Sequence, residues 1–238
     1  MRVAVVGGSG RLGRVIRSNL SSRPSSLPAR SIERLELDER LRTKQSFEGF
    51  QALVIALGSG HFASTCAFEC DGLLVQAVIA AACQSPSVET IILVSCFGVD
   101  DFSHWTRDEL AAHGVVSAMS DAPGSTRPEV LHWKRESEMA LRAATTTASS
   151  TTKHLIVRCP PTLDFDGKTA AAGVVVPCDP GTHGARAKER ASAEGVAGFV
   201  GGAIHRHLSG TVELSSSLTA SCAWGREEGA ARRVPVEC

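Results

Sequence analysis

The sequence contains no tyrosine, so any mechanism that uses a phenol to donate or accept a proton is excluded. It also has no net charge, because 25 lysines and arginines balance 25 aspartates and glutamates, and a neutral chain has no general attraction to nucleic acid or to a membrane surface. Long apolar runs are missing too: none approaches the roughly 18 residues of a membrane-spanning helix, and glycines end the first run too early for a signal peptide. These absences predict a soluble, cytoplasmic protein whose partner is a small molecule.

The eight cysteines lack the paired spacing of a disulfide framework, which fits a reducing compartment. Cys66 and Cys70 could lie one helical turn apart, but no pair of histidines completes a metal site with them. We therefore expect buried free thiols and no bound metal.

The strongest motif lies at the start of the chain, MRVAVVGGSGRLGRVIRSNL. Residues 3–6 are apolar on both faces, as in a central parallel strand, and a helical pattern follows the turn. Gly7, Gly10 and Gly13 stand between them, in the strand–turn–helix context that a dinucleotide-binding turn requires. Glycine lets backbone N–H groups approach a ligand, and the helix start attracts negative charge. We expect a diphosphate site in which Gly10 needs a positive φ or a contact that a Cβ would block; the alternative is a tight turn without a ligand.

Apolar runs alternate with helical patterns along the rest of the chain. This order predicts right-handed crossovers and a parallel sheet, so we expect an α/β fold with one doubly wound domain over residues 1–217. A small substrate-side portion ends this domain, and a tail covers 218–238. The expected strands cover residues 32–38, 52–57, 90–94, 154–158, 173–177 and 210–214, and the expected helices cover 65–83, 130–144 and 191–208.

Five stretches of the sequence are informative through the order in which they occur. They are VVGGSGRLG at 5–13, ALVIALGSG at 52–60, TIILVSCFG at 90–98, KRESEMALR at 134–142 and HLIVRCPPTLD at 154–164, with a weaker sixth, ASAEGVAGFV, at 191–200. In this order they resemble the atypical short-chain dehydrogenases/reductases of the NmrA-like NAD(P)-binding family, and within it the flavin reductase/biliverdin reductase B group. The resemblance implies a Rossmann fold and a bound NAD(P); we expect a monomer or a homodimer.

The sequence departs from that family at the position of its acid–base group. Standard members carry a tyrosine four residues before a lysine, where this chain has Val130 before Lys134. The flavin and biliverdin reductase group is thought to act without that tyrosine. The resemblance therefore implies hydride transfer from NADPH to a planar acceptor such as a flavin, a quinone or a tetrapyrrole, in a pocket formed by residues 97–128 and 161–177. The alternative is a non-catalytic NAD(P)-binding sensor of the NmrA-like kind; a nucleotide-sugar epimerase is disfavoured because its relatives depend on the missing tyrosine.

The choice between NAD and NADP depends on the segment after the glycine motif. This segment is short for the family, which implies a trimmed adenosine side. An acidic residue about 20 positions past the motif favours NAD, whereas an arginine nearby favours NADP. Arg30 stands near that distance and Asp38 somewhat beyond it. We expect NADP, held through Arg30 and Arg11; the alternative is that Arg30 is an ordinary loop arginine.

Two residues are candidates for catalysis. By resemblance, Ser95 faces the nicotinamide, and Lys134 binds the ribose hydroxyls; the alternative for Lys134 is a surface lysine paired with Glu138. Cys96 is expected to be a packed small residue rather than a nucleophile. His132 could supply the missing acid, although a surface histidine is the simpler interpretation. The expected cofactor-binding residues are Gly7, Ser9, Gly10, Arg11, Leu12, Gly13, Arg30, Leu57, Gly58, Ser59, Ser95, Lys134, Pro160, Pro161 and Thr162.

Overall fold

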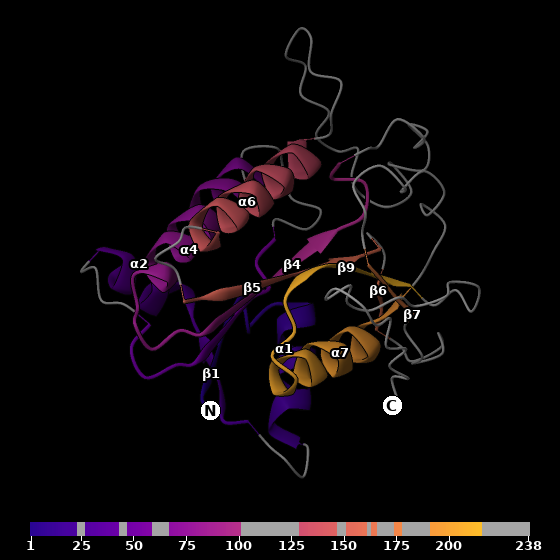
Figure 1. Ribbon diagram of the computed structural model, residues 1–238, viewed down its shortest axis with the longest axis horizontal. Helices are drawn as coiled ribbons and strands as arrows, with labels where there is room; N and C mark the ends of the chain where they lie inside the picture. Colours follow the sequence, from indigo (N-terminus) through magenta and orange to yellow (C-terminus); the bar gives the residue numbers. More distant parts are fainter. Residues whose placement is uncertain are drawn as a thin grey trace, which may run out of the picture.

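The structure is a computed structural model that describes residues 1–22, 27–42, 47–58, 67–100, 129–146, 151–160, 163–165, 174–177 and 191–215. The strands are β1 (Val3–Val6), β2 (Ala29–Ile32), β3 (Ala52–Ile55), β4 (Thr90–Cys96), β5 (Lys153–Cys159), β6 (Leu163–Asp164), β7 (Val174–Pro177), β8 (Ala191–Ser192) and β9 (Gly210–Ser215). Seven of them form one sheet in the order β2-β1-β3-β4-β5-β9-β7 (Figure 1). Within it, β7 runs antiparallel to β9 and the other pairings are parallel.

Helices cover both faces of this sheet (Figure 1). One face carries α1 (Arg11–Ser22) and α7 (Ala193–His205), and the other carries α2 (Arg34–Arg42), the π-helix η1 (Phe68–Leu74), α4 (Val75–Cys83) and α6 (Glu129–Thr145). Successive side chains of a strand point to opposite faces, so a strand covered on both sides is apolar throughout. Every residue of β1 and of β3 is buried, as the sequence predicts. The predicted Rossmann-type, doubly wound fold is thus confirmed.

The order of the strands defines where a ligand can bind. From β1 the chain passes to β2 on one side and then to β3 on the other. In open parallel sheets of this kind, ligands bind beyond the carboxyl ends of the strands at the point where the order reverses. That point lies beside the glycine turn that follows β1.

The expected strand over residues 32–38 is wrong. β2 ends at Ile32, and the chain then enters α2. Leu37 and Leu41 pack against the same core at helical spacing, and Glu36 forms an ion pair with Arg40 at 2.8 Å. The letters alternate as they would in a strand, but the four-residue spacing of apolar and charged partners stabilises a helix. The segment between the glycine turn and β3, although short for the family, therefore still contains α1, β2 and α2.

Other boundaries differ from the expected ones by small amounts. The helix expected over 65–83 is a π-helix followed by an α-helix within its described part, residues 67–83. The last helix begins at Ala193, because Ser192 accepts a hydrogen bond from the backbone N–H of Gly195 at 3.0 Å and caps it. No helix in the described ranges has the length and apolar character needed to cross a membrane. The expected tail, 218–238, lies outside the described residues.

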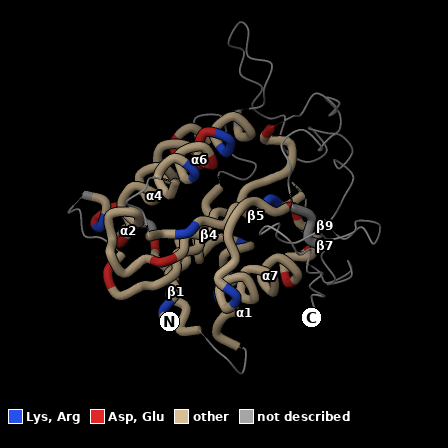
Figure 2. Tube along the Cα trace, in the orientation of Figure 1, with Lys and Arg blue, Asp and Glu red and all other residues tan. Residues whose placement is uncertain are grey.

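Charged residues occur on α6 and on the strands beneath it (Figure 2), and ion pairs join some of their side chains into a cluster between α6 and β5. Arg158 is 1% exposed and donates hydrogen bonds from Nε and Nη2 to the Glu138 carboxylate at 3.0 and 2.7 Å. Its Nη2 also lies 2.7 Å from Asp100 Oδ2, and its Nη1 lies 3.8 Å from Glu213 Oε1. Arg142 donates to Glu138 at 3.0 Å. The cluster joins α6, β5, β9 and the turn after β4.

Candidate functional site

The glycine turn between β1 and α1 depends on two glycines for its shape. Gly7 has a φ of +85°, and a Cβ there would lie 2.5 Å from the carbonyl oxygen of Ala56, just past β3. A Cβ on Gly13 would collide with the carbonyl oxygen of Gly7. Only glycine fits either position without moving the backbone. The turn is therefore packed between β1, the end of β3 and the first turn of α1.

Gly10 differs from the expectation, because its φ is not positive and a Cβ would meet only the Gly7 carbonyl oxygen, at 3.2 Å. Gly10 is exposed, and its N–H donates to that same oxygen at 3.0 Å, which closes the turn. The first N–H groups of α1 point beyond it without acceptors inside the helix. The turn thus forms an open cradle of backbone donors at a positive helix end, which suits a diphosphate.

Three side chains near the cradle have different surroundings. Ser9 is exposed. Leu12 packs against the core beside α1 and α7. The guanidinium of Arg11 lies 4.1 Å from the centre of the Phe165 ring, which is cation–π distance. Since Ser9 is exposed at the turn, its hydroxyl is accessible to a phosphate bound there.

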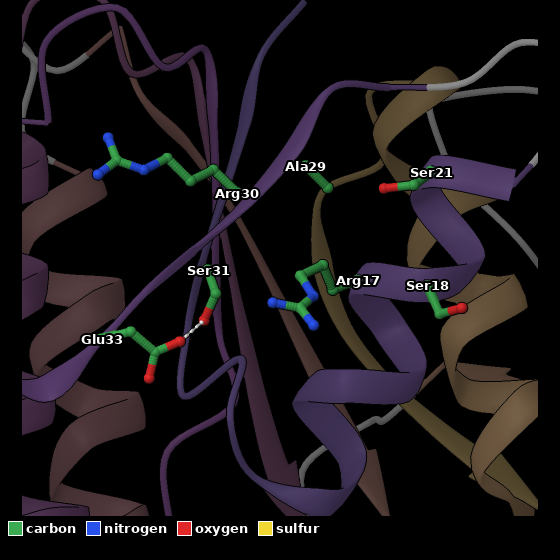
Figure 3. Close-up of a pocket in the computed structure, with 7 residues that line it drawn as sticks. All are labelled: Arg17, Ser18, Ser21, Ala29, Arg30, Ser31 and Glu33. Atoms are coloured by element: carbon green, nitrogen blue, oxygen red, sulfur yellow. Dashed lines mark hydrogen bonds between the residues drawn. The ribbon is translucent and has the colours of Figure 1, made fainter.

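Arg30, the arginine expected to favour NADP, is in register with Ala4 of β1, three residues before Gly7. Arg30 lies within β2 and forms an ion pair with Glu36 at 2.8 Å. Glu33 comes directly after β2, 20 residues past Gly13, and its Oε1 accepts a hydrogen bond from Ser31 Oγ at 2.7 Å. Figure 3 shows Arg30 extending away from this pair. A cavity of about 550 Å³ is lined here by Arg17, Ser18 and Ser21 of α1 and by Ala29, Arg30, Ser31 and Glu33.

Ser95 lies near the carboxyl end of β4, in register with Arg158 of β5. It is 4% exposed, and within the described part of the chain its hydroxyl has no hydrogen-bond partner. A buried hydroxyl without a partner costs free energy, so a ligand atom that bonded to it would be stabilised. The role of Ser95 facing a cofactor stays a prediction.

Lys134 pairs with Asp71, not with Glu138. Its Nζ lies 2.7 Å from Asp71 Oδ1, and the Asp71 side chain is fully buried. Burial alone would lower the pKa of the Lys134 ammonium, but the Asp71 carboxylate outweighs this effect with help from Cys96 and Glu138, and the pKa lies above its ordinary value. Lys134 is therefore a fixed cation, and the interpretation as a surface lysine paired with Glu138 is wrong.

Sequence reasoning missed Asp71 and Glu33, although both left a signal. Asp71 is followed by an uncharged stretch as far as Val88, and a carboxylate that leads into a buried helix requires a partner. Glu33 stands at the spacing from the glycine motif where an acidic residue holds a ribose. The wrong strand prediction placed the end of β2 too late and drew attention to Arg30 instead.

The two thiols at the ends of β4 and β5 lie side by side in the sheet, since Cys96 pairs in register with Cys159. Burial raises the pKa of each thiol to about 12, with Lys134 opposing the rise. A thiol with such a pKa is not a nucleophile at neutral pH. The raised pKa agrees with the expectation that Cys96 is not a nucleophile, and its side chain is partly buried.

The remaining candidates are placed in part. Leu57 packs against the core on the α4 side. Gly58 lies beside the ion pair, since a Cβ there would be 3.6 Å from Asp71 Oδ1 and 3.8 Å from Lys134 Nζ. Pro160 is buried just after β5, and the His132 ring packs edge-on against Trp133. Ser59, Pro161, Thr162 and most of the expected acceptor pocket lie outside the described residues.

Comparisons with known proteins find similarity at the level of structure. No family model matches the sequence, and no curated protein matches it. An oxidoreductase from Lactococcus lactis is 16% identical with a TM-score of 0.61, over 92% of this chain and 93% of that one. A protein assigned provisionally as an NADH-flavin reductase from Streptococcus pneumoniae is 15% identical with a TM-score of 0.59, over 90% and 99%.

A third solved structure contains a cofactor. It is a human epimerase-family protein with NADPH, 17% identical with a TM-score of 0.53, over 90% of this chain and 74% of that one. At these identities the similarity concerns the fold. This chain therefore shares a Rossmann-type α/β fold with these three proteins, and that fold is the one the resemblance predicts.

Proposed function

We propose that the protein binds a nicotinamide dinucleotide along the carboxyl ends of β1, β3 and β4 and reduces a planar acceptor. One observation carries this proposal: three groups lie at the carboxyl ends of the parallel strands. These are the open cradle at Gly10, the Ser95 hydroxyl, which has no partner among the described residues, and the Lys134 ammonium. They are the three kinds of group that a diphosphate, a carboxamide or carbonyl, and ribose hydroxyls require. Two structural neighbours, proteins described with NADPH and as an NADH-flavin reductase, add support.

The residues of the chain fit such a cofactor. The cradle and the start of α1 would hold the diphosphate, Lys134 the nicotinamide ribose and Ser95 the carboxamide or the acceptor carbonyl. When bound, the reduced nicotinamide supplies the hydride. The buried Phe97 and Val99 after β4 would exclude water from this end of the site.

Among the described groups at the site, none can supply the proton that the reduced acceptor takes up, so we expect this proton to come from solvent. The pKa of Lys134 is raised, and the pKa of the Cys96 thiol is about 12, so both keep their protons near neutral pH. The chain has no tyrosine. Acceptors that take their proton from water, such as flavins and quinones, are therefore favoured over simple ketones.

Titration of the protein with NAD, NADH, NADP and NADPH by calorimetry tests the binding part. Consumption of the reduced cofactor with flavin and quinone acceptors tests the reaction. Tight binding without turnover above the rate in free solution would favour the second candidate, a non-catalytic redox sensor, which the missing tyrosine supports. Absence of binding by all four dinucleotides would refute both.

We infer NADH as the preferred cofactor. The NADP expectation depends on Arg30, whose guanidinium pairs with Glu36. Glu33 instead stands at the end of β2, and its partner Ser31 lies against the glycine turn, where a Cβ on Gly8 would meet the Ser31 side chain. A carboxylate at this place accepts hydrogen bonds from the 2′- and 3′-hydroxyls of NADH and repels the 2′-phosphate of NADPH.

Replacing Glu33 with glutamine should weaken NADH binding about tenfold, because charge-assisted hydrogen bonds to the ribose are lost. NADPH binding should become tighter, since the repulsion is removed. Calorimetric titration with both cofactors measures the two changes. Glu36→Gln is the matched control: its carboxylate faces Arg30 and Arg40, so the ratio of the two affinities should stay near that of the parent. A parent that prefers NADPH would contradict the assignment.

A further inference from the structure

Three side chains of α6 hold Asp71 and its neighbour Gly72 in place. Lys134 Nζ lies 2.7 Å from Asp71 Oδ1. Ser137 Oγ donates a hydrogen bond to the Asp71 backbone oxygen at 2.6 Å. The Trp133 ring covers the next residue, Gly72. Side chain, backbone and neighbour are thus all fixed against the same helix.

The local backbone is built for this close approach. Asp71 lies in the π-helix η1, a rare conformation that often marks functional sites. A Cβ on Gly72 would lie 2.9 Å from the Trp133 ring, so a larger residue would push η1 away from α6. Glycine and the π-helix together bring the Asp71 carboxylate to Lys134.

The two members of the pair differ in what a ligand can reach. The Asp71 side chain is fully covered, whereas 18% of the Lys134 side chain is exposed. The pair stands beside Gly58, just past β3, at the edge of the sheet where ligands bind. A ligand would therefore contact the ammonium, and Asp71 would act only through it.

We propose that Asp71 is a positioning residue of the dinucleotide site: it fixes the Lys134 ammonium at the end of β3 and keeps it charged for the cofactor ribose. This inference rests on the proposed function. Among the described residues, the charged and titratable groups that face Lys134 are Asp71 of η1, Cys96 of β4 and Glu138 of α6, and Cys159 of β5 lies near them. Both thiols are neutral below about pH 10, so Asp71 is the close carboxylate that compensates the buried cation.

The test is Asp71→Asn, which keeps the shape of the side chain and removes its charge. Without the carboxylate, burial lowers the pKa of Lys134. The parent should bind NADH with nearly constant affinity between about pH 7 and pH 9.5, whereas the variant should weaken about tenfold over that range. In the protein without cofactor, ¹³C-dimethylation of the lysines lets NMR follow the same titration, because methylation retains the charge. The Lys134 signal is assigned by its loss in Lys134→Arg.

Two controls separate positioning from general damage. Glu69→Gln removes an exposed carboxylate from the same π-helix and should leave both the NADH profile and the Lys134 titration as in the parent. In a Lys134→Met background, Asp71→Asn should have no further effect on NADH affinity. An unchanged Lys134 titration, an unchanged pH profile of NADH binding, or additive effects in the double variant would overturn the proposal. Failure of the parent to bind any of the four dinucleotides would refute the proposed function, and this role with it.

Discussion

Replacing Glu138 with glutamine is expected to lower the free energy of unfolding by up to about 3–5 kcal/mol, the cost of removing one partner from a buried ion pair, while Asp100 and Glu213 stay beside Arg158. The Glu138 side chain is fully buried and accepts hydrogen bonds from both Nε and Nη2 of Arg158, which is itself 1% exposed. Glutamine has a similar volume, but it carries no charge to balance the guanidinium. Its side chain has one acceptor oxygen, so it cannot accept hydrogen bonds from both Nε and Nη2 of Arg158 as the two carboxylate oxygens do. Urea denaturation near neutral pH measures the loss.

Two other substitutions on α6 provide the comparison. Glu136→Gln removes a partly exposed carboxylate 3.9 Å from Arg135 and should change stability by less than about 0.5 kcal/mol. Arg142→Met removes the ion pair between Arg142 and Glu138. Because the Arg142 side chain is 35% exposed, this change should lower the free energy of unfolding by about 1 kcal/mol or less. A loss below about 1 kcal/mol for Glu138→Gln would mean that water reaches Arg158 and that the cluster is not a buried one.

Replacing Gly10 with valine should weaken NADH binding at least tenfold, or about 1.4 kcal/mol, while the protein still folds. The valine side chain would stand where the diphosphate is proposed to lie. A small shift of the turn accommodates the substitution, since φ is not positive and a Cβ would lie 3.2 Å from the Gly7 oxygen, which has to move by a few tenths of an ångström. Loss of a glycine cap costs less than about 1 kcal/mol of stability. Calorimetry gives the affinity, and thermal unfolding gives the stability.

Gly13→Val separates the two roles of the glycines. A Cβ at Gly13 would strike the Gly7 backbone, so this variant should lose several kcal/mol of stability, as overpacked or strained sites do. If Gly10→Val bound NADH as tightly as the parent, the diphosphate would not lie at this turn. The assignment of the whole sheet edge would then have to change.

The sequence was sufficient to predict the centre of the fold, because buried parallel strands are apolar at every position and need no partner information. Residues 3–6, 52–57 and 90–94 show this pattern, and β1, β3 and β4 lie there. The glycine motif likewise placed the turn correctly, since its function depends on local backbone geometry. The positions that require glycine, however, are Gly7 and Gly13, where a Cβ would collide with backbone atoms, and not Gly10.

The parts that sequence could not supply depend on contacts between distant segments. Lys134 has a carboxylate four residues on, at Glu138, and local spacing favours that pair. In the structure Glu138 forms an ion pair with Arg158 of β5, and Lys134 forms an ion pair with Asp71 of η1. The edge strand was also misplaced, because the apolar and polar letters after Ile32 satisfy a strand and a helix equally. Only packing of Leu37 against the core decides between them.

The charge cluster also bears on the order in which the chain is synthesised. Its members come from residues as far apart as Asp100 and Glu213, and β9 is the last described strand to be made. Until β9 docks, β5 is an unprotected edge of apolar strand, the kind of surface that pairs with other chains. We therefore expect the growing chain to be prone to aggregation until β9 is complete, because β9 covers the edge of β5 and places Glu213 beside Arg158.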